Sequence, residues 1–138
     1  MSNKDTKEFD ERGNLIHFKD SSGFEYWQEF DKNDNLIHYR NCNGLESWYK
    51  YDKNNNLIHY KDSYNYEEWY EYDERGNEVY LKQLNIFGNY YEEWRKYDEK
   101  NKAIKINEQE FKQIKRRKIK QELYLNIKNS NRFGIMDI

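Results

Sequence analysis

The chain has 138 residues, of which 36% are charged and 18% aromatic, and its net charge is −2. This length suits one domain, and the aromatic content argues against a disordered chain. The sequence holds neither a long run of apolar residues nor an apolar segment near its start, so it predicts no membrane span and no signal peptide. We expect a cytoplasmic protein, which the single cysteine, Cys42, also favours because it forms no internal disulfide.

Charge is unevenly distributed along the chain. Acidic residues outnumber basic ones over residues 1–100, and basic residues outnumber acidic ones over residues 101–138. Such a basic tail is typical of nucleic-acid binding, but it is also typical of a helix that docks on an acidic part of its own chain. The many Lys, Asn, Ile and Tyr residues, with no proline, are typical of low-GC bacteria and their phages.

After an N-terminal leader at residues 1–8, an internal repeat is predicted over residues 9–106. Each unit begins with an aromatic residue followed by aspartate: Phe9-Asp10, Phe30-Asp31, Tyr51-Asp52, Tyr72-Asp73 and Tyr97-Asp98. The tryptophans follow at spacings of 21, 21 and 25 residues, at Trp27, Trp48, Trp69 and Trp94. A fixed period of this kind indicates one small structural unit per repeat, stacked on its neighbours.

Each unit reads as a β-hairpin. The segment after each aromatic-aspartate pair is rich in Gly, Asn and Asp, as in Asn33-Asp34, which predicts a two-residue type I′ turn. The return turns, such as Cys42-Asn43-Gly44, end in Gly or Asn and predict a three-residue hairpin. The fold class is therefore mainly β: an antiparallel meander sheet of about ten short strands from 21-residue hairpin repeats, followed by a C-terminal α-helix.

Turn type fixes the register of the strands, and register fixes which side chains share a face. The predicted cross-strand pairs include Phe30 with Ile37, Glu29 with His38, Trp27 with Arg40, His38 with Trp48, and Lys50 with His59. One face, here called the tyrosine face, collects Ile16, Phe18, Tyr26, Phe30, Ile37, Tyr39, Tyr49, Tyr51, Ile58, Tyr60, Tyr70, Tyr72, Val79, Leu81 and Tyr97. The other, here called the tryptophan face, collects the four tryptophans, Leu36, Leu57, the histidines and alternating charged residues.

A helix is predicted at residues 107–128, followed by a tail at 129–138. Asn107 suits the N-cap and Glu110 the third helical position, which together form a capping-box pattern. Basic residues are distributed over several sides of this helix, and together they form a basic cluster: Lys112, Lys115, Arg116, Arg117, Lys118 and Lys120.

The segments Tyr51-Asp52-Lys53-Asn54-Asn55-Asn56-Leu57 and Tyr72-Asp73-Glu74-Arg75-Gly76-Asn77 resemble the tyrosine-aspartate (YD, or RHS-type) repeat. The resemblance covers about residues 9–106. In that family, long arrays spiral into a β-shell around a toxin or form extracellular stalks, which implies a meander sheet here as well. The resemblance carries over no functional residue.

No catalytic motif, cofactor site or metal site is predicted. His17, His38 and His59 recur at 21 residues, but equivalent strands of neighbouring units lie about 10 Å apart, too far for the ligands of one metal ion. The adjacent acids Glu67 and Glu68 point to opposite faces of a strand and cannot act as a pair. We therefore expect a protein that is not an enzyme.

The sequence predicts more aromatic surface than the chain can cover. Ten strands make a sheet about 45 Å wide, whereas one helix is about 10 Å across. Exposed apolar surface of this extent marks an interaction site, for which the candidate residues are Trp27, Trp48, Trp69, Trp94, Tyr49 and Tyr70.

The leading hypothesis is a non-enzymatic binding protein that presents an acidic, aromatic sheet to a protein partner, such as a nuclease or ribonucleoprotein with a basic surface. Size, charge and composition prompt the narrower hypothesis of a phage-type counter-defence inhibitor, similar in style to anti-CRISPR proteins. The alternatives are a nucleic-acid or carbohydrate binder that stacks its ligand on the tryptophans, and a self-assembling structural module such as a homodimer. The basic helix offers a second route to nucleic acid, and no membrane partner is expected.

Overall fold

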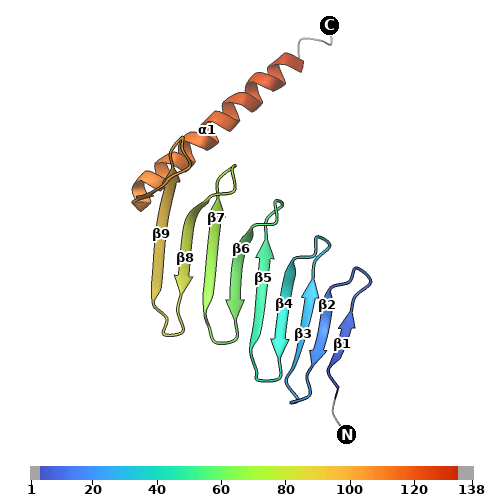
Figure 1. Cartoon of the computed structure of the whole chain (residues 1–138). Coiled ribbons are helices and arrows are strands. Elements are labelled where there is room, and N and C mark those ends of the chain that lie inside the picture. Colours follow the sequence, from blue (N-terminus) through green and yellow to red (C-terminus); the bar gives the residue numbers. More distant parts are fainter. Residues whose placement is uncertain (1–3, 134–138) are drawn as a thin grey trace. The chain divides into compact units, whose positions relative to one another are not determined.

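The computed structural model describes residues 4–133, with side chains to residue 130. It contains ten strands and one helix: β1 Thr6–Phe9, β2 Leu15–Lys19, β3 Glu25–Phe30, β4 Leu36–Asn41, β5 Glu46–Tyr51, β6 Leu57–Asp62, β7 Glu67–Tyr72, β8 Glu78–Leu84, β9 Tyr90–Tyr97, β10 Ala103–Ile106 and α1 Glu108–Phe133. The strands lie in sequence order in one antiparallel sheet (Figure 1). The predicted meander with a C-terminal helix is confirmed.

The chain divides into two units, one ending at Glu92 and the other beginning at Glu93, within β9. Two element bounds differ from the predicted segments. Strand β1 begins at Thr6, inside the expected leader, and the helix runs to Phe133, into the expected tail. Residues 134–138 of that tail lie outside the described part of the chain.

Every turn between consecutive strands has the same construction, shown by the turn from Asp31 to Asn35. The backbone N–H of Asp31 donates to the Asn35 carbonyl at 2.9 Å, and the N–H of Asp34 donates to the Asp31 carbonyl at 3.2 Å. The Asp31 carboxylate Oδ1 accepts from the N–H groups of Asn33 and Asn35 at 2.8 and 3.0 Å. An Asp or Asn opens every turn in this way, because its short side chain reaches the backbone two and four residues later.

The predicted type I′ turns are wrong. A type I′ turn needs two residues with positive φ, whereas each turn has one, such as Asp34 at 63° or Asn55 at 64°. The loop is therefore a type I turn closed by a left-handed residue, with a bulge in the strand pairing. As a result Phe30 pairs with Leu36 and not with Ile37.

Beyond the bulge, the predicted register returns. The pairs Glu29 with His38, Trp27 with Arg40, His38 with Trp48, and Lys50 with His59 are confirmed. The two predicted faces follow from these pairs, because side chains alternate along each strand.

The tyrosine of the repeated Tyr-Asp pair ties neighbouring strands together. The hydroxyl of Tyr51 donates to the backbone carbonyl of Leu36 at 2.9 Å, and that of Tyr72 donates to the carbonyl of Leu57 at 2.8 Å. The tyrosine thus satisfies a carbonyl at the beginning of the preceding strand, and the aspartate after it orders the next turn. Phe9 and Phe30 lack the hydroxyl that makes this bond.

The first unit is a single layer of strands and turns without an apolar core. Among its described residues the buried side chains are those of Ser47, 2% exposed, and Asp62, 9% exposed. Most apolar side chains of both faces are half-buried against their neighbours in the sheet, whereas Phe9 and Trp48 are exposed. Cross-strand pairs and turns therefore hold this unit together, where a globular domain would rely on a buried core.

The buried apolar residues among those that the structure describes, Ile106 and Phe111, lie in the second unit. Its helix begins as predicted: Asn107 is the N-cap, and its side-chain Oδ1 accepts from the backbone N–H of Glu110 at 2.9 Å. From Lys115 to Ser130 every described side chain is exposed.

The turn carboxylates predict acid sensitivity. Hydrogen bonds from the asparagine four residues later hold the pKa values of Asp10, Asp31 and Asp52 below 3.8. Their contribution to stability is complete above the unfolded value and is lost as the pH falls through the lower folded values. We expect the free energy of unfolding, measured in urea, to decline below about pH 4.

An Asp-to-Asn variant separates charge from turn geometry. Asn41 opens its own turn with the same acceptor, taking the N–H groups of Asn43 and Leu45 at 2.9 and 3.2 Å. The triple variant Asp10→Asn, Asp31→Asn, Asp52→Asn is therefore expected to fold at pH 7 and to lose less stability in acid than the parent chain. Equal acid sensitivity of the two proteins would contradict this account.

Candidate binding surfaces of the sheet

The candidate residues lie on two surfaces. In the first unit Trp27, Trp48 and Trp69 are on the tryptophan face, in β3, β5 and β7, and Tyr49 and Tyr70 are on the opposite face. The tryptophans and tyrosines therefore cannot contact one small ligand together. Trp94 belongs to the second unit, where it pairs with Ile106 of β10.

The tryptophan face is built from cross-strand ladders, in which directly opposite residues of consecutive strands follow one another; ladders 1 and 2 each cross five strands. A ladder holds, in order, a glutamate, a histidine, a tryptophan, a cation and a second glutamate. Ladder 1 is Glu8, His17, Trp27, Arg40 and Glu46; ladder 2 is Glu29, His38, Trp48, Lys61 and Glu67. The register repeats every 21 residues, so that residue types spaced by 21 occupy equivalent places.

Each of these histidines is held between two carboxylates. In ladder 1, His17 Nδ1 lies 3.0 Å from Glu8 and Nε2 lies 2.8 Å from Glu25. In ladder 2, His38 Nδ1 lies 3.0 Å from Glu29 and Nε2 lies 2.8 Å from Glu46. Sequence reasoning missed the carboxylates on Nε2, although Glu25 and Glu46 each follow their histidine by eight residues.

The indole faces are largely occupied by protein. The His17 ring stacks on Trp27 at 5.1 Å between ring centroids, and the Arg40 guanidinium lies 4.6 Å from the same indole. Trp48 is more open: His38 stacks on it at 5.6 Å, its side chain is 40% exposed, and no cation lies over it among the described residues. A base or sugar that stacked on Trp27 would have to displace a charged side chain.

The carboxylates raise the pKa of both histidines. Hydrogen bonds to Glu8 and then Glu25 raise the pKa of His17 above 6.5. Burial lowers the pKa of His38, but the hydrogen bonds to Glu29 and Glu46 outweigh it, so the net direction is also upward. These ladders thus favour the protonated imidazole.

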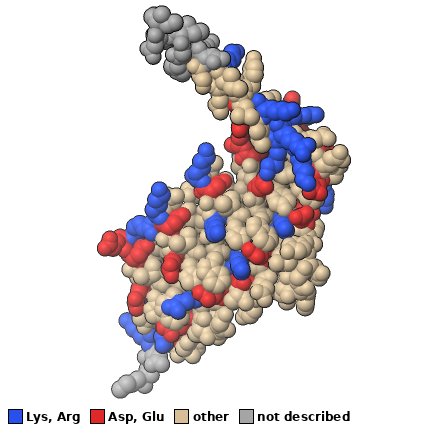
Figure 2. Space-filling view, turned by 180° about the vertical axis from the view of Figure 1, so that it is seen from behind, with Lys and Arg blue, Asp and Glu red and all other residues tan. Residues whose placement is uncertain are grey.

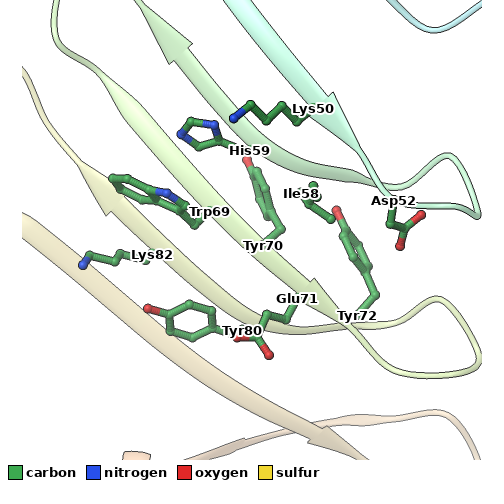
Figure 3. Close-up of a pocket in the computed structure, with 10 residues that line it drawn as sticks. All are labelled: Lys50, Asp52, Ile58, His59, Trp69, Tyr70, Glu71, Tyr72, Tyr80 and Lys82. Carbon is green, nitrogen blue, oxygen red and sulfur yellow. The ribbon is translucent and has the colours of Figure 1, made fainter. Parts of the chain in front are cut away.

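A third ladder departs from this pattern. It begins with Lys50, where the first two begin with glutamate, and continues through His59, Trp69 and Lys82. An open groove of about 690 Å³ lies here, and Figure 3 shows the Lys50 side chain extending toward the His59 ring.

The tyrosine face contains a hydroxyl-carboxylate network. Glu68 accepts hydrogen bonds from the hydroxyls of Tyr66 and Tyr70, each at 2.5 Å, and from the Gln83 amide at 2.7 Å. The bond to Glu68 raises the pKa of Tyr66 to about 12, whereas burial and then the same carboxylate raise that of Tyr70. The Tyr70 hydroxyl thus already has a hydrogen-bond partner within the sheet, and the Tyr70 ring is half-buried.

The basic cluster of the helix forms a separate, exposed surface. Figure 2 shows basic side chains gathered along the helix, whereas acidic and basic side chains are interspersed over the sheet. Lys112 pairs with Glu108 at 2.5 Å one turn away, and Lys115 lies 5.4 Å from the Phe111 ring. Arg116, Arg117 and Lys118 are exposed.

The described residues offer neither a cluster of three or more metal-ligating His, Cys, Asp or Glu side chains nor a helix long and apolar enough to cross a membrane. Cys42 is a free, exposed thiol in a turn.

Solved structures share this fold. The chain is similar to part of a TcdB2-TccC3-TEV crystal structure, with a TM-score of 0.62 and 16% identity over 72% of this chain. It is also similar to part of a Photorhabdus luminescens Tc holotoxin pore, with a TM-score of 0.60 and 16% identity over 75% of this chain. It spans 5% of the length of each. This likeness supports the resemblance to the tyrosine-aspartate repeat at the level of the fold.

No protein-family model matches the chain. No curated protein matches it either.

The ladder histidines predict a decline in stability with rising pH. A raised folded pKa contributes stability that is complete below the unfolded value of 6.5 and is lost as the pH rises through the folded value. We expect the free energy of unfolding to fall between about pH 6 and pH 8. The double variant His17→Gln, His38→Gln is expected to flatten this dependence, and an unchanged slope in urea titrations would contradict the assignment.

Proposed function

We propose that this protein is a non-enzymatic binding module that presents the tyrosine face of its repeat sheet to a partner protein. The single observation that carries the proposal is the aromatic layer of the first unit. The rings of Tyr49, Tyr60 and Tyr70 are half-buried by neighbours in the sheet, and among the described residues of that unit no second layer packs on them. Partly accessible aromatic surface of this kind is typical of interaction sites.

The tyrosine face suits this role better than the tryptophan face. Several charges on the tryptophan face are paired, as His17 is with Glu8 and Glu25, and a partner that covered them would have to desolvate each pair. The tyrosine face has fewer charges and many rigid rings, such as the Tyr49 and Tyr60 pair at 5.2 Å. Tyrosine rings give large contact areas at a low cost in conformational entropy.

The acidic charge of the repeat region suggests what kind of surface the partner presents. Residues 1–100 carry an excess of acidic side chains, which favours a partner with a basic surface around its binding site. A nuclease or ribonucleoprotein fits this description, and a counter-defence inhibitor of the anti-CRISPR kind is the narrower version of the proposal. Size, charge and composition support that version.

Variants of the two faces test the proposal. Tyr49→Lys places a charge on the tyrosine face, and Trp48→Lys places the same charge on the preceding residue of β5, on the opposite face. We expect the tagged parent chain to retain a discrete protein from a bacterial lysate, and Tyr49→Lys to retain at least about tenfold less. Trp48→Lys is expected to retain amounts close to those of the parent.

Circular dichroism and unfolding midpoints establish that both variants fold. Equal loss of the captured protein in both variants, or loss only in Trp48→Lys, would contradict the assignment to the tyrosine face. Light scattering on the parent chain separates a second copy from a different partner. A stable dimer disrupted by Tyr49→Lys would assign the face to self-assembly.

A further inference from the structure

The repeat provides an internal template for a ligand site. In ladders 1 and 2, a glutamate carboxylate lies 3.0 Å from histidine Nδ1, with Glu8 facing His17 and Glu29 facing His38. The equivalent residue of the third ladder is Lys50, directly opposite His59. In the first two ladders a glutamate carboxylate of the chain itself faces histidine Nδ1, whereas in the third ladder no such carboxylate faces His59 Nδ1.

The departure leaves two groups without partners. His59 Nε2 lies 2.7 Å from Glu67, as its equivalents lie near Glu25 and Glu46, but within the described residues its Nδ1 has no hydrogen-bond partner. Lys50 is exposed and forms no ion pair with any residue that the structure describes. The Lys50 ammonium group and His59 Nδ1 thus lie on the same face of the sheet, on directly paired residues.

The surrounding groove has room for a ligand. Its volume is about 690 Å³, and its lining includes Lys50, His59, Trp69, Tyr80 and Lys82 (Figure 3). It is open to solvent along the sheet surface, so that a group carried on a larger molecule can enter.

We propose that this groove binds a carboxylate, which takes the position that the Glu8 and Glu29 carboxylates occupy in the first two ladders. Lys50 supplies the charge. His59 Nδ1 faces the bound oxygen at hydrogen-bond distance, as the Nδ1 atoms of His17 and His38 face the carboxylates of Glu8 and Glu29. The carboxylate belongs to a small acid or to an acidic side chain, and both present the same two oxygens.

The neighbouring charges decide where the carboxylate sits. Lys82 lies 5.3 Å from Trp69 and 4.6 Å from Tyr90, and its ammonium is 3.8 Å from Glu92, so part of its charge is already offset. Glu71 is on the same face, two strands from Lys50, and repels an anion on that side. Lys50 and His59 therefore form the binding end of the groove.

Histidine imidazole NMR on the intact chain tests the proposal. Acetate, glutarate and an N- and C-capped glutamate dipeptide are titrated separately into ¹⁵N-histidine-labelled protein, with inorganic phosphate as a further arm. We expect a saturable shift of the His59 nitrogen signals with a dissociation constant on the order of 1 mM or weaker. His17 and His38 are expected to stay unchanged, because their Nδ1 atoms already have a carboxylate.

Reciprocal variants separate this site from general charge effects. Lys50→Glu restores the ladder pattern and is expected to weaken carboxylate binding at His59 at least about tenfold. Lys53→Glu makes the same change in charge in the adjacent turn and is expected to leave binding unchanged. Glu29→Lys reproduces the third ladder in the second, so His38 is expected to respond to acetate in that variant.

The outcomes are distinguishable. A response to acetate and glutarate supports a small acid, and a response to the dipeptide alone supports an acidic side chain. A response to phosphate alone, equal shifts of all three histidines, or binding that survives Lys50→Glu would overturn the proposal. The site lies on the tryptophan face, so its failure would leave the proposed role of the tyrosine face intact.

Discussion

The hydrogen bonds from the backbone to the Asp or Asn that opens each turn are the interactions on which the rest of the structure depends. That side chain fixes a type I turn with one left-handed residue, and the turn fixes the bulge and the register of its hairpin. A slip of one residue would move every side chain to the opposite face, which would mix the tyrosines with the charged ladders. Both surfaces therefore exist because the same turn recurs along the sheet.

A single-layer sheet has to be stable without an interior, and its two faces meet this requirement differently. On the tryptophan face, ladders 1 and 2 place a carboxylate, an imidazole, an indole, a cation and a second carboxylate side by side on consecutive strands. Four such pairs contribute roughly 1 to 4 kcal/mol per ladder, at about 0.2 to 1 kcal/mol a pair. On the tyrosine face, rings half-bury one another, and hydroxyls bond to backbone carbonyls or to Glu68. Because this second face satisfies its own polar groups while leaving its rings accessible, it can be covered by a partner at a lower desolvation cost.

Sequence reasoning reached the meander, the two faces and the pairing of Glu29 with His38 because all three follow from a period of 21 and from alternation along strands. It placed Phe30 opposite Ile37 because Asn33 and Asp34 both tolerate positive φ, and composition does not say that only Asp34 adopts it. The preference of Asp31 for the N–H groups two and four residues later decides between the turns. The carboxylates on histidine Nε2 were missed, since Glu25 and Glu46 come from the far side of the next turn. The exposure of the basic helix depends on tertiary packing, which its irregular apolar spacing did not specify.

A sheet held by turns and neighbouring pairs tolerates replacement of most side chains on its faces, because few of its described residues are buried. This explains how the present chain shares a fold with parts of the Tc toxin structures at 16% identity. For the same reason, a residue that differs between equivalent positions of the repeat can be examined for a role other than stability. When an equivalent position holds glutamate in two units and lysine in the third, fold stability does not require the lysine, since glutamate satisfies the same geometry twice. The Lys50 ammonium removes one attractive pair from its ladder and places a positive charge opposite His59, and this is the departure that the proposed carboxylate site uses.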